Sequence, residues 1–332
     1  MVRFSLFWRR VGLVWVLLTG LSLLTACGGE ESVSETTTVG EQVVVVLPPT
    51  SEPEAGFDPI QGWGAGEHVH EPLIQSTLTV TTADLEIGYD LATDLTVSAD
   101  GLVWTATLRS DVFFTDGEPL TAADVAFTYN LARDASTAND LTMLEEAVAV
   151  DDSTVEFHLN RPYAIWPYTL ATLGIVPEHA YGPAYGGAPI GSGRYQLTQW
   201  DRGQQVILTA NPDYYGEPVQ MDRVVVVFLA EDAALAAVRS GQGDLAYTAA
   251  TYSEQQFAGY RLLAVPSVDN RGINLPAQAF DGEKGNDFTA DPLVRQAIQA
   301  GLDREKMIAH VLNGYGSPAY SVCDGTPWAS PE

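Results

Sequence analysis

The residue with the most specific chemistry in this chain is a cysteine that follows a short apolar segment near the N-terminus. Basic residues within the first ten positions precede an apolar run over residues 11–24, and Leu24-Thr25-Ala26 leads into Cys27. The run is shorter than the about 20 residues of a membrane-spanning helix, and small residues before a cysteine suit a signal peptidase. We therefore predict a lipoprotein signal peptide over residues 1–27, with lipid attached to Cys27. An ordinary anchor helix is the alternative, which the polar residues 28–31 disfavour.

A polar segment separates this cysteine from the first strand-like sequence. Residues 28–40 are rich in Gly, Ser, Thr and Glu and contain almost no large apolar side chain. Such a composition cannot bury enough surface to fold, so it predicts a flexible tether. Two or three acyl chains on Cys27 would hold the protein in the cell envelope, on the outer face of the cytoplasmic membrane or in the periplasm.

Two histidines and a glutamate lie together in His68-Val69-His70-Glu71. These side chains are common metal ligands, but histidines two residues apart can share an ion only on an extended chain, and no third ligand has an obvious spacing. We therefore predict no bound metal and no cofactor. Ile74 stands where a zinc protease would need another histidine, and no Gly-x-Ser-x-Gly elbow occurs. An anchored hydrolase stays an alternative only through paired carboxylates.

The composition indicates a large globular body with an acidic surface. The chain has 332 residues, 46% of them hydrophobic, which is enough for at least two folding units. Its formal net charge of -27 excludes nucleic acid as a partner, because phosphate binding needs clustered Lys and Arg. The chain has two cysteines, so lipid on Cys27 would leave Cys323 without an internal disulfide partner.

Apolar patterns predict an α/β chain. Residues 42–47 and 223–229 are β-branched runs typical of central strands that are buried on both faces. After the second run, Asp232 is expected to cap a helix through Arg239 that Gly241 ends, before another strand over residues 244–249 completes a βαβ unit. Further strands are predicted over 102–109 and 154–159, and strands over 195–200 and 205–210 are expected to form a hairpin through Asp201-Arg202-Gly203. The remaining predictions are a helix from 122 capped by Thr121 and two late helices capped by Asp291 and Asp303.

Three groups of motifs recur in one known family. The first joins residues 98–105 (SADGLVWT), through Leu108-Arg109, to 114–125 (FTDGEPLTAADV), and the second joins residues 189–195 (PIGSGRY) to 210–216 (ANPDYYG). The third joins residues 294–305 to Asn313-Gly314-Tyr315-Gly316. In this order the motifs resemble the family 5 extracellular solute-binding proteins of ABC importers, which include peptide, oligopeptide and nickel receptors. Arg194 departs from the family, which usually has proline at that position.

The resemblance implies an α/β fold of the two-lobe periplasmic-binding-protein type II, with an extra subdomain in the N-terminal lobe. The implied N-terminal lobe spans residues 41–265, with an inserted subdomain at about 76–187, and residues 266–332 begin a second lobe. Members of the family generally continue beyond the third motif, so the second lobe is expected to be incomplete in this chain. We therefore expect this chain to bind solute weakly. We also expect it to expose apolar surface around Val294, Ile298 and Ile308.

The function that the resemblance implies is binding without catalysis. A monomeric receptor tethered to the bilayer would close on a peptide or a similar small polar solute and deliver it to an ABC permease. A receptor for nickel or another metal chelate is an alternative within the same family. Sensing rather than import is also compatible with the same cleft.

Ligand contacts are expected from loops at the carboxyl ends of strands, where open α/β sheets bind their ligands. Trp63 and His68 follow the first strand, Tyr247 lies at the predicted strand over 244–249, and Asn270 with Arg271 lies where the chain should cross to the second lobe. Trp63 could form a stacking wall or anchor its own loop. Arg271 could clamp a carboxylate or form a salt bridge between the lobes.

Overall fold

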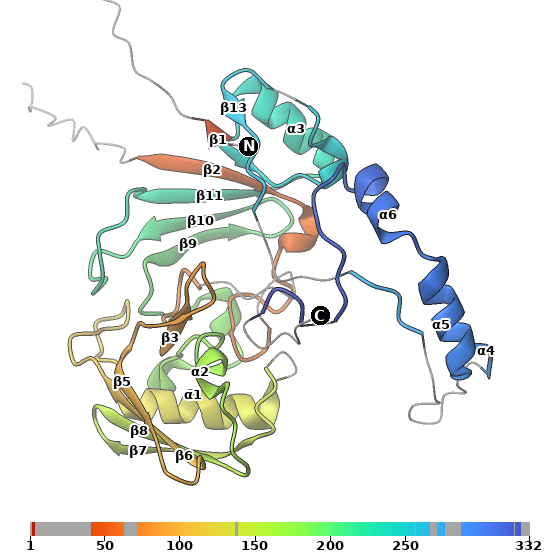
Figure 1. The fold of residues 1–332 in the computed structure, drawn as a ribbon. Coiled ribbons are helices and arrows are strands. Elements are labelled where there is room, and N and C mark those ends of the chain that lie inside the picture. Colours follow the sequence, from red (N-terminus) through yellow and green to blue (C-terminus); the bar gives the residue numbers. More distant parts are fainter. Residues whose placement is uncertain are drawn as a thin grey trace, which may run out of the picture.

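The computed structural model contains three β-sheets. It describes residues 2–3, 41–62, 72–136, 139–255, 257–265, 271–275, 287–321 and 323–326. The largest sheet has seven strands in the order β13-β1-β12-β2-β11-β10-β9, another has four in the order β5-β6-β8-β7, and β3 pairs with β4. The two larger sheets lie at different ends of the molecule, with helices α4, α5 and α6 along one side (Figure 1).

A βαβ unit forms the middle of the seven-stranded sheet. Strand β2 (Gln42–Leu47) lies between β11 (Arg223–Phe228) and β12 (Leu245–Ala246) and is parallel to both. Helix α3 (Glu231–Ser240) connects β11 to β12, and Gly241 ends it in the left-handed conformation with a φ of 76°. The predicted unit is therefore confirmed.

Three details of that prediction are corrected by the structure. Asp232 does not cap α3, because the helix begins at Glu231. Ala230 is the N-cap residue, and Asp232 lies in the first turn. The strand predicted over 244–249 shortens to two residues, because the backbone N–H of Tyr247 makes the last bond to β2. Burial of the central strand β2 is only partial: Val46 is buried on one face, while Val43, Val45 and Leu47 are half-buried against the core on the other.

Antiparallel strands extend the sheet on both sides. The predicted hairpin is confirmed as β9 (Tyr195–Asp201) and β10 (Gln205–Ala210), and β10 also pairs with β11. On the other side, the two-residue strand β1 (Val2–Arg3) lies between β12 and β13 (Tyr260–Arg261) and is antiparallel to both. Strand β1 therefore separates β12 from β13, two strands that come from much later in the chain.

The four-stranded sheet belongs to the predicted inserted subdomain. Its strands are β5 (Ala92–Val97), β6 (Val103–Leu108), β7 (Leu144–Asp151) and β8 (Thr154–Leu159), all antiparallel. Helix α1 (Ala122–Ala135) packs against β7 and β8. Its predicted cap is confirmed, because the Thr121 N–H donates to Asp124 Oδ2 at 2.9 Å.

Aromatic residues fill the core between α1 and this sheet. The rings of Tyr129 and Phe157 meet edge to face with centroids 4.9 Å apart, and Trp166 of α2 (Trp166–Thr169) packs on Phe157 at 5.5 Å. All three side chains are fully buried. The short strands β3 (Thr79–Thr81) and β4 (Ile87–Tyr89) adjoin this core, and Leu78 just before β3 belongs to it.

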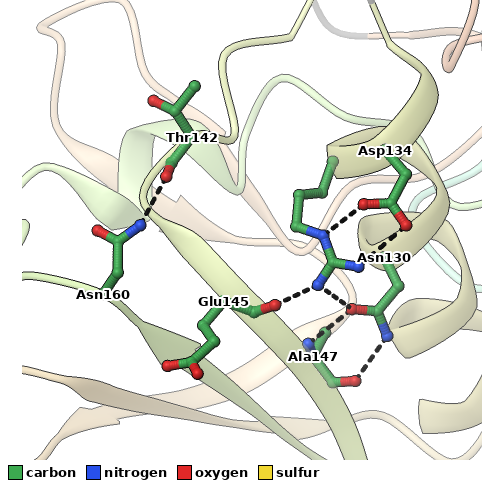
Figure 2. A network of polar contacts seen from close by, with 7 residues as sticks. Asn130, Asp134, Thr142, Glu145, Ala147 and Asn160 are labelled. Atoms are coloured by element: carbon green, nitrogen blue, oxygen red, sulfur yellow. Dashed lines mark hydrogen bonds and ion pairs between the residues drawn. The ribbon is translucent and has the colours of Figure 1, made fainter.

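The outer edge of β7 is covered by side chains of α1. Asn130 Nδ2 donates to the carbonyl of Ala147 at 2.8 Å, and the Ala147 N–H donates back to Asn130 Oδ1 at 2.9 Å (Figure 2). The Arg133 guanidinium, paired with Asp134, donates to the carbonyl of Glu145. Unpaired strand edges invite further strands, so α1 closes one such edge.

A polar cluster joins the segments next to β5 and β6 to the loop between β10 and β11. The Tyr215 hydroxyl donates to Asp90 Oδ1 at 2.5 Å, and the Arg109 guanidinium lies 4.6 Å above the Tyr215 ring while it pairs with Asp111. Burial, followed by the neighbouring carboxylate of Asp90, raises the pKa of the Tyr215 phenol. Arg109 continues the first sequence motif and Tyr215 belongs to the second, so these two motifs are in contact.

The late helices begin as predicted. Asp291 accepts from the Leu293 N–H at the start of α5 (Pro292–Gly301), and Asp303 accepts from the Lys306 N–H at the start of α6 (Arg304–Val311). A short helix α4 (Asp287–Ala290) precedes them. No residue of α5 or α6 is buried. Val294, Ile298 and Ile308, around which exposed apolar surface was expected, are half-buried, and the large exposed apolar side chains of α5 and α6 are their neighbours Leu293, Met307 and Val311.

Candidate functional site

The carboxyl ends of the parallel strands define the candidate site. Because β11, β2 and β12 run in the same direction, the segments that follow them meet at one edge of the sheet. The β9–β10 turn also lies there, since the Phe228 N–H at the end of β11 donates to the carbonyl of Gln204 at 2.9 Å. This is the edge at which open α/β sheets bind their ligands.

Glu52 fixes the β9–β10 turn against the loop that follows β2. Its carboxylate accepts from the Trp200 indole Nε1 at 2.9 Å, and the Gly203 N–H donates to its two oxygens at 2.8 and 3.0 Å. Gly203 has a φ of 72°, which a residue with a side chain adopts only with strain. Phe57 meets the Trp200 ring edge-on at 5.2 Å, so polar and apolar contacts both hold the turn.

A hollow opens between these two segments. It has a volume of about 460 Å³, and its lining residues are Pro49, Thr50, Glu52, Pro53, Glu54 and Arg202. This volume is in the range of small-molecule sites. The Arg202 guanidinium lies 4.1 Å from the centroid of the Trp200 ring, so a stacked cation borders the hollow.

Acidic groups dominate the other half of the edge. Glu231, at the start of α3, accepts from the Ala249 N–H at 2.7 Å and from the Thr248 hydroxyl at 3.2 Å, which ties the segment after β11 to the segment after β12. The charges of Asp232 and then Glu231 raise the pKa of the Tyr252 phenol, as expected in a negative field. The edge therefore carries acids at both ends, with an arginine beside those of the hollow.

One of the predicted contact residues lies at this edge. Tyr247 is the first residue after β12, its N–H donates to the Val46 carbonyl at 3.1 Å, and its side chain is 58% exposed. Arg271 is exposed and forms no ion pair with any described residue, so neither of its predicted roles is tested. The other predicted residues, Trp63, His68 and Asn270, lie outside the described residues, as do Cys27 and residues 69–71.

Sequence reasoning missed the residues that shape the hollow. Glu52 lies 148 positions before Trp200, and a loop glutamate has no local signature of such a contact. Arg202 stood in the predicted hairpin turn, where a charged residue is ordinary. The pairing of β10 with β11, which brings the turn to this edge, was the missing information.

The described part of the chain provides no recognisable metal centre. Within it, no group of three or more His, Cys, Asp or Glu side chains could hold an ion. Cys323 is half-buried and not in a disulfide. Among the same residues, no helix combines the length and the apolar character needed to cross a membrane.

Most of the chain is similar to one family of known proteins. The family model described as bacterial extracellular solute-binding proteins, family 5 middle, matches residues 86–332. Protein XP55 of Streptomyces lividans is 35% identical over 302 residues, which are 86% of this chain and 53% of that protein. The oligopeptide-binding protein AppA of Bacillus subtilis is 28% identical over 280 residues, 79% of this chain and 50% of AppA. The chain thus spans about half the length of these relatives.

Solved structures share the fold. AppA of Bacillus subtilis, in complex with a nonapeptide, has a TM-score of 0.69 and 25% identity, over 88% of this chain and 60% of that one. NikZ of Campylobacter jejuni, in complex with Ni(L-His), has a TM-score of 0.72 and 24% identity, over 84% of this chain and 56% of that one. At this identity the likeness to NikZ shows the fold alone. The expected α/β fold of the periplasmic-binding-protein type is confirmed.

Proposed function

Because the chain belongs to the family 5 bacterial extracellular solute-binding proteins, we propose that it captures a peptide or a similar small polar solute and delivers it to an ABC permease. The observation that supports this most is the family match over residues 86–332 together with the sheet edge built by β2, β11 and β12. Relatives named as peptide-binding proteins, among them AppA, favour a peptide. Membership in a family of binding proteins argues against the anchored hydrolase.

The contact residues are also part of the proposal. Tyr247 is exposed at the carboxyl end of β12, where its ring is free to contact a solute. Trp63, His68, Asn270 and Arg271 stay predicted contacts. We further propose the lobe boundaries given above, with residues 41–265 as the N-terminal lobe, and a monomeric receptor tethered through a lipid on Cys27.

Thermal unfolding of the full chain in detergent tests the proposed function. A ligand at a hundredfold excess over its Kd stabilises the native state by about 2.7 kcal/mol, so binding raises the Tm by several degrees. We expect this rise with dipeptides or oligopeptides and a smaller one in Tyr247→Ala. Tyr89→Ala is the matched control, because Tyr89 is similarly exposed but lies in the subdomain strand β4.

The outcome with other solutes separates the alternatives. A rise in Tm with nickel chelates and none with peptides would favour the metal-chelate receptor. No rise with any solute, even at concentrations high enough to detect the weak binding expected when the second lobe is incomplete, would contradict solute capture by this chain. Equal rises in the wild type and Tyr247→Ala would remove Tyr247 from the contact residues and leave the function in place.

A further inference from the structure

We propose that Arg202 receives a carboxylate group of the captured solute at the hollow between the loop after β2 and the β9–β10 turn. This inference rests on the proposed function and adds the class of group that the site recognises. The carboxylate could be the C-terminus of a peptide or an acidic side chain. Both sources present the same planar pair of oxygens.

Arg202 is held in place before any ligand arrives. Its guanidinium lies 4.1 Å from the Trp200 ring centroid, and the Trp200 indole is fixed by its bond to Glu52 at 2.9 Å. Stacking leaves the N–H groups at the rim of the guanidinium plane free to donate, and it reduces the entropy lost when a ligand binds. Stacked arginines with a free rim suit bidentate recognition of carboxylates.

The charge of Arg202 is not neutralised within the described part of the chain. No described carboxylate forms an ion pair with Arg202, and its side chain is exposed. Of the two acids that line the hollow, Glu52 already accepts from Trp200 and Gly203 through both of its oxygens, and Glu54 forms no ion pair with Arg202. In a chain of net charge -27, a cation without an acidic partner gives an anion a favourable local position.

The remaining walls of the hollow narrow the choice of solute. Pro49 and Pro53 give it rigid apolar sides, and Thr50 adds a hydroxyl. Glu54 also lines it, so a solute with a positive group near its carboxylate is favoured over one with two negative charges. A zwitterionic peptide fits this description.

Peptide titrations followed by NMR test the role of Arg202. The Trp200 indole Nε1–H signal of the ¹⁵N-labelled full chain reports on the hollow and detects weak binding. We expect trialanine with a free carboxylate to shift this signal at a concentration about tenfold or more below that of trialanine amide. Ala-Glu-Ala amide, whose only carboxylate is the side chain, separates the two sources. Recovery of tight binding with it would assign the site to acidic side chains.

Variants of Arg202 give the decisive comparison. Arg202→Gln is expected to abolish the preference for the free acid over the amide, and Arg202→Lys to keep part of it, because lysine retains the charge without the planar fork. Arg239→Gln is the matched control: Arg239 also stacks on an aromatic ring, Phe257 at 4.8 Å, but lies near the other end of α3. It makes the same charge change and should keep the preference.

The two proposals fail differently. If the wild type binds peptides and Arg202→Gln keeps the preference for the free acid, the assignment of Arg202 is wrong and the proposed function stands. If the wild type binds none of the three peptides at millimolar concentration, the proposed peptide capture fails and the assignment fails with it. Circular dichroism of each variant shows whether a loss comes from unfolding.

Discussion

At the scale of single residues, carboxylates join segments that are distant in the sequence. Glu52 reaches Trp200 and Gly203, and Asp90 accepts from Tyr215, which is 125 positions away. The contacts to Trp200 and Tyr215 satisfy polar groups in partly buried settings, where an unpaired group would be costly, whereas the contact to Gly203 is exposed. Such contacts cannot be predicted from local sequence, because nothing near Glu52 distinguishes it from a solvated glutamate.

A similar contact, between His179 and Asp116, depends on pH. His179 Nε2 lies 2.8 Å from Asp116 Oδ2, and this bond is the main reason that the pKa of His179 is raised above 6.5. Because the folded pKa is the higher one, the stabilisation is complete below about pH 6.5 and is lost as the pH rises through the folded value. NMR titration of the His179 ring should show this raised pKa, and Asp116→Asn should lower it.

Asp134→Asn is the control for that titration, since it removes an exposed aspartate that pairs with Arg133 instead. It should leave the pKa of His179 unchanged. A His179 pKa that stays raised in Asp116→Asn would show that the more distant acids, Asp124 and Glu118, account for the shift.

At the scale of elements, the sequence predicts helix starts and ends best, because a capping residue or a left-handed glycine is a local signal with a single structural outcome. Gly241 ends α3, and Asp291 and Asp303 begin α5 and α6, because a left-handed glycine and a capping carboxylate act within one turn. Asp232 misled the prediction, because either of two adjacent acids could open the helix. The helix begins at Glu231 behind Ala230, without a side-chain cap, and the Glu231 carboxylate accepts from the Ala249 N–H instead. Strand ends depend on partners elsewhere, so β12 is shorter than its apolar pattern indicates.

The edge of β7 offers a test at this scale. Asn130→Ala removes both bonds to Ala147 and leaves its N–H and carbonyl without a partner beside α1. We expect a loss of about 1–3 kcal/mol in the free energy of unfolding, and more light scattering at the midpoint as the edge becomes available to other chains. Urea denaturation followed by circular dichroism measures the first effect.

Asn160→Ala is a fair comparison, because Asn160 makes one exposed bond, to the Thr142 carbonyl at 2.7 Å (Figure 2). Its loss should cost less than about 1 kcal/mol. Equal losses in the two variants would mean that the covering of β7 contributes nothing beyond a single surface hydrogen bond.

At the scale of the whole molecule, the proposed tether makes a prediction about membrane attachment. Acylated Cys27 should carry the chain into the detergent phase of a Triton X-114 separation and should incorporate labelled palmitate in bacteria. Cys27→Ser should partition into the aqueous phase. Cys323→Ser, the matched change at the second cysteine, should behave like the wild type. Labelled palmitate in Cys27→Ser would contradict the assignment.

The position of β1 has a consequence for the proposed cleavage before Cys27. Cleavage before Cys27 would remove Val2 and Arg3, the two residues that separate β12 from β13. Neighbouring strands lie about 4.8 Å apart, so the departure of β1 would open a vacancy one strand wide inside the sheet, bordered on both sides by unbonded backbone. Exposed backbone of this kind attracts any extended segment that can pair with it. Processing of the leader and completion of the largest sheet by a replacement strand would then be two parts of one folding event.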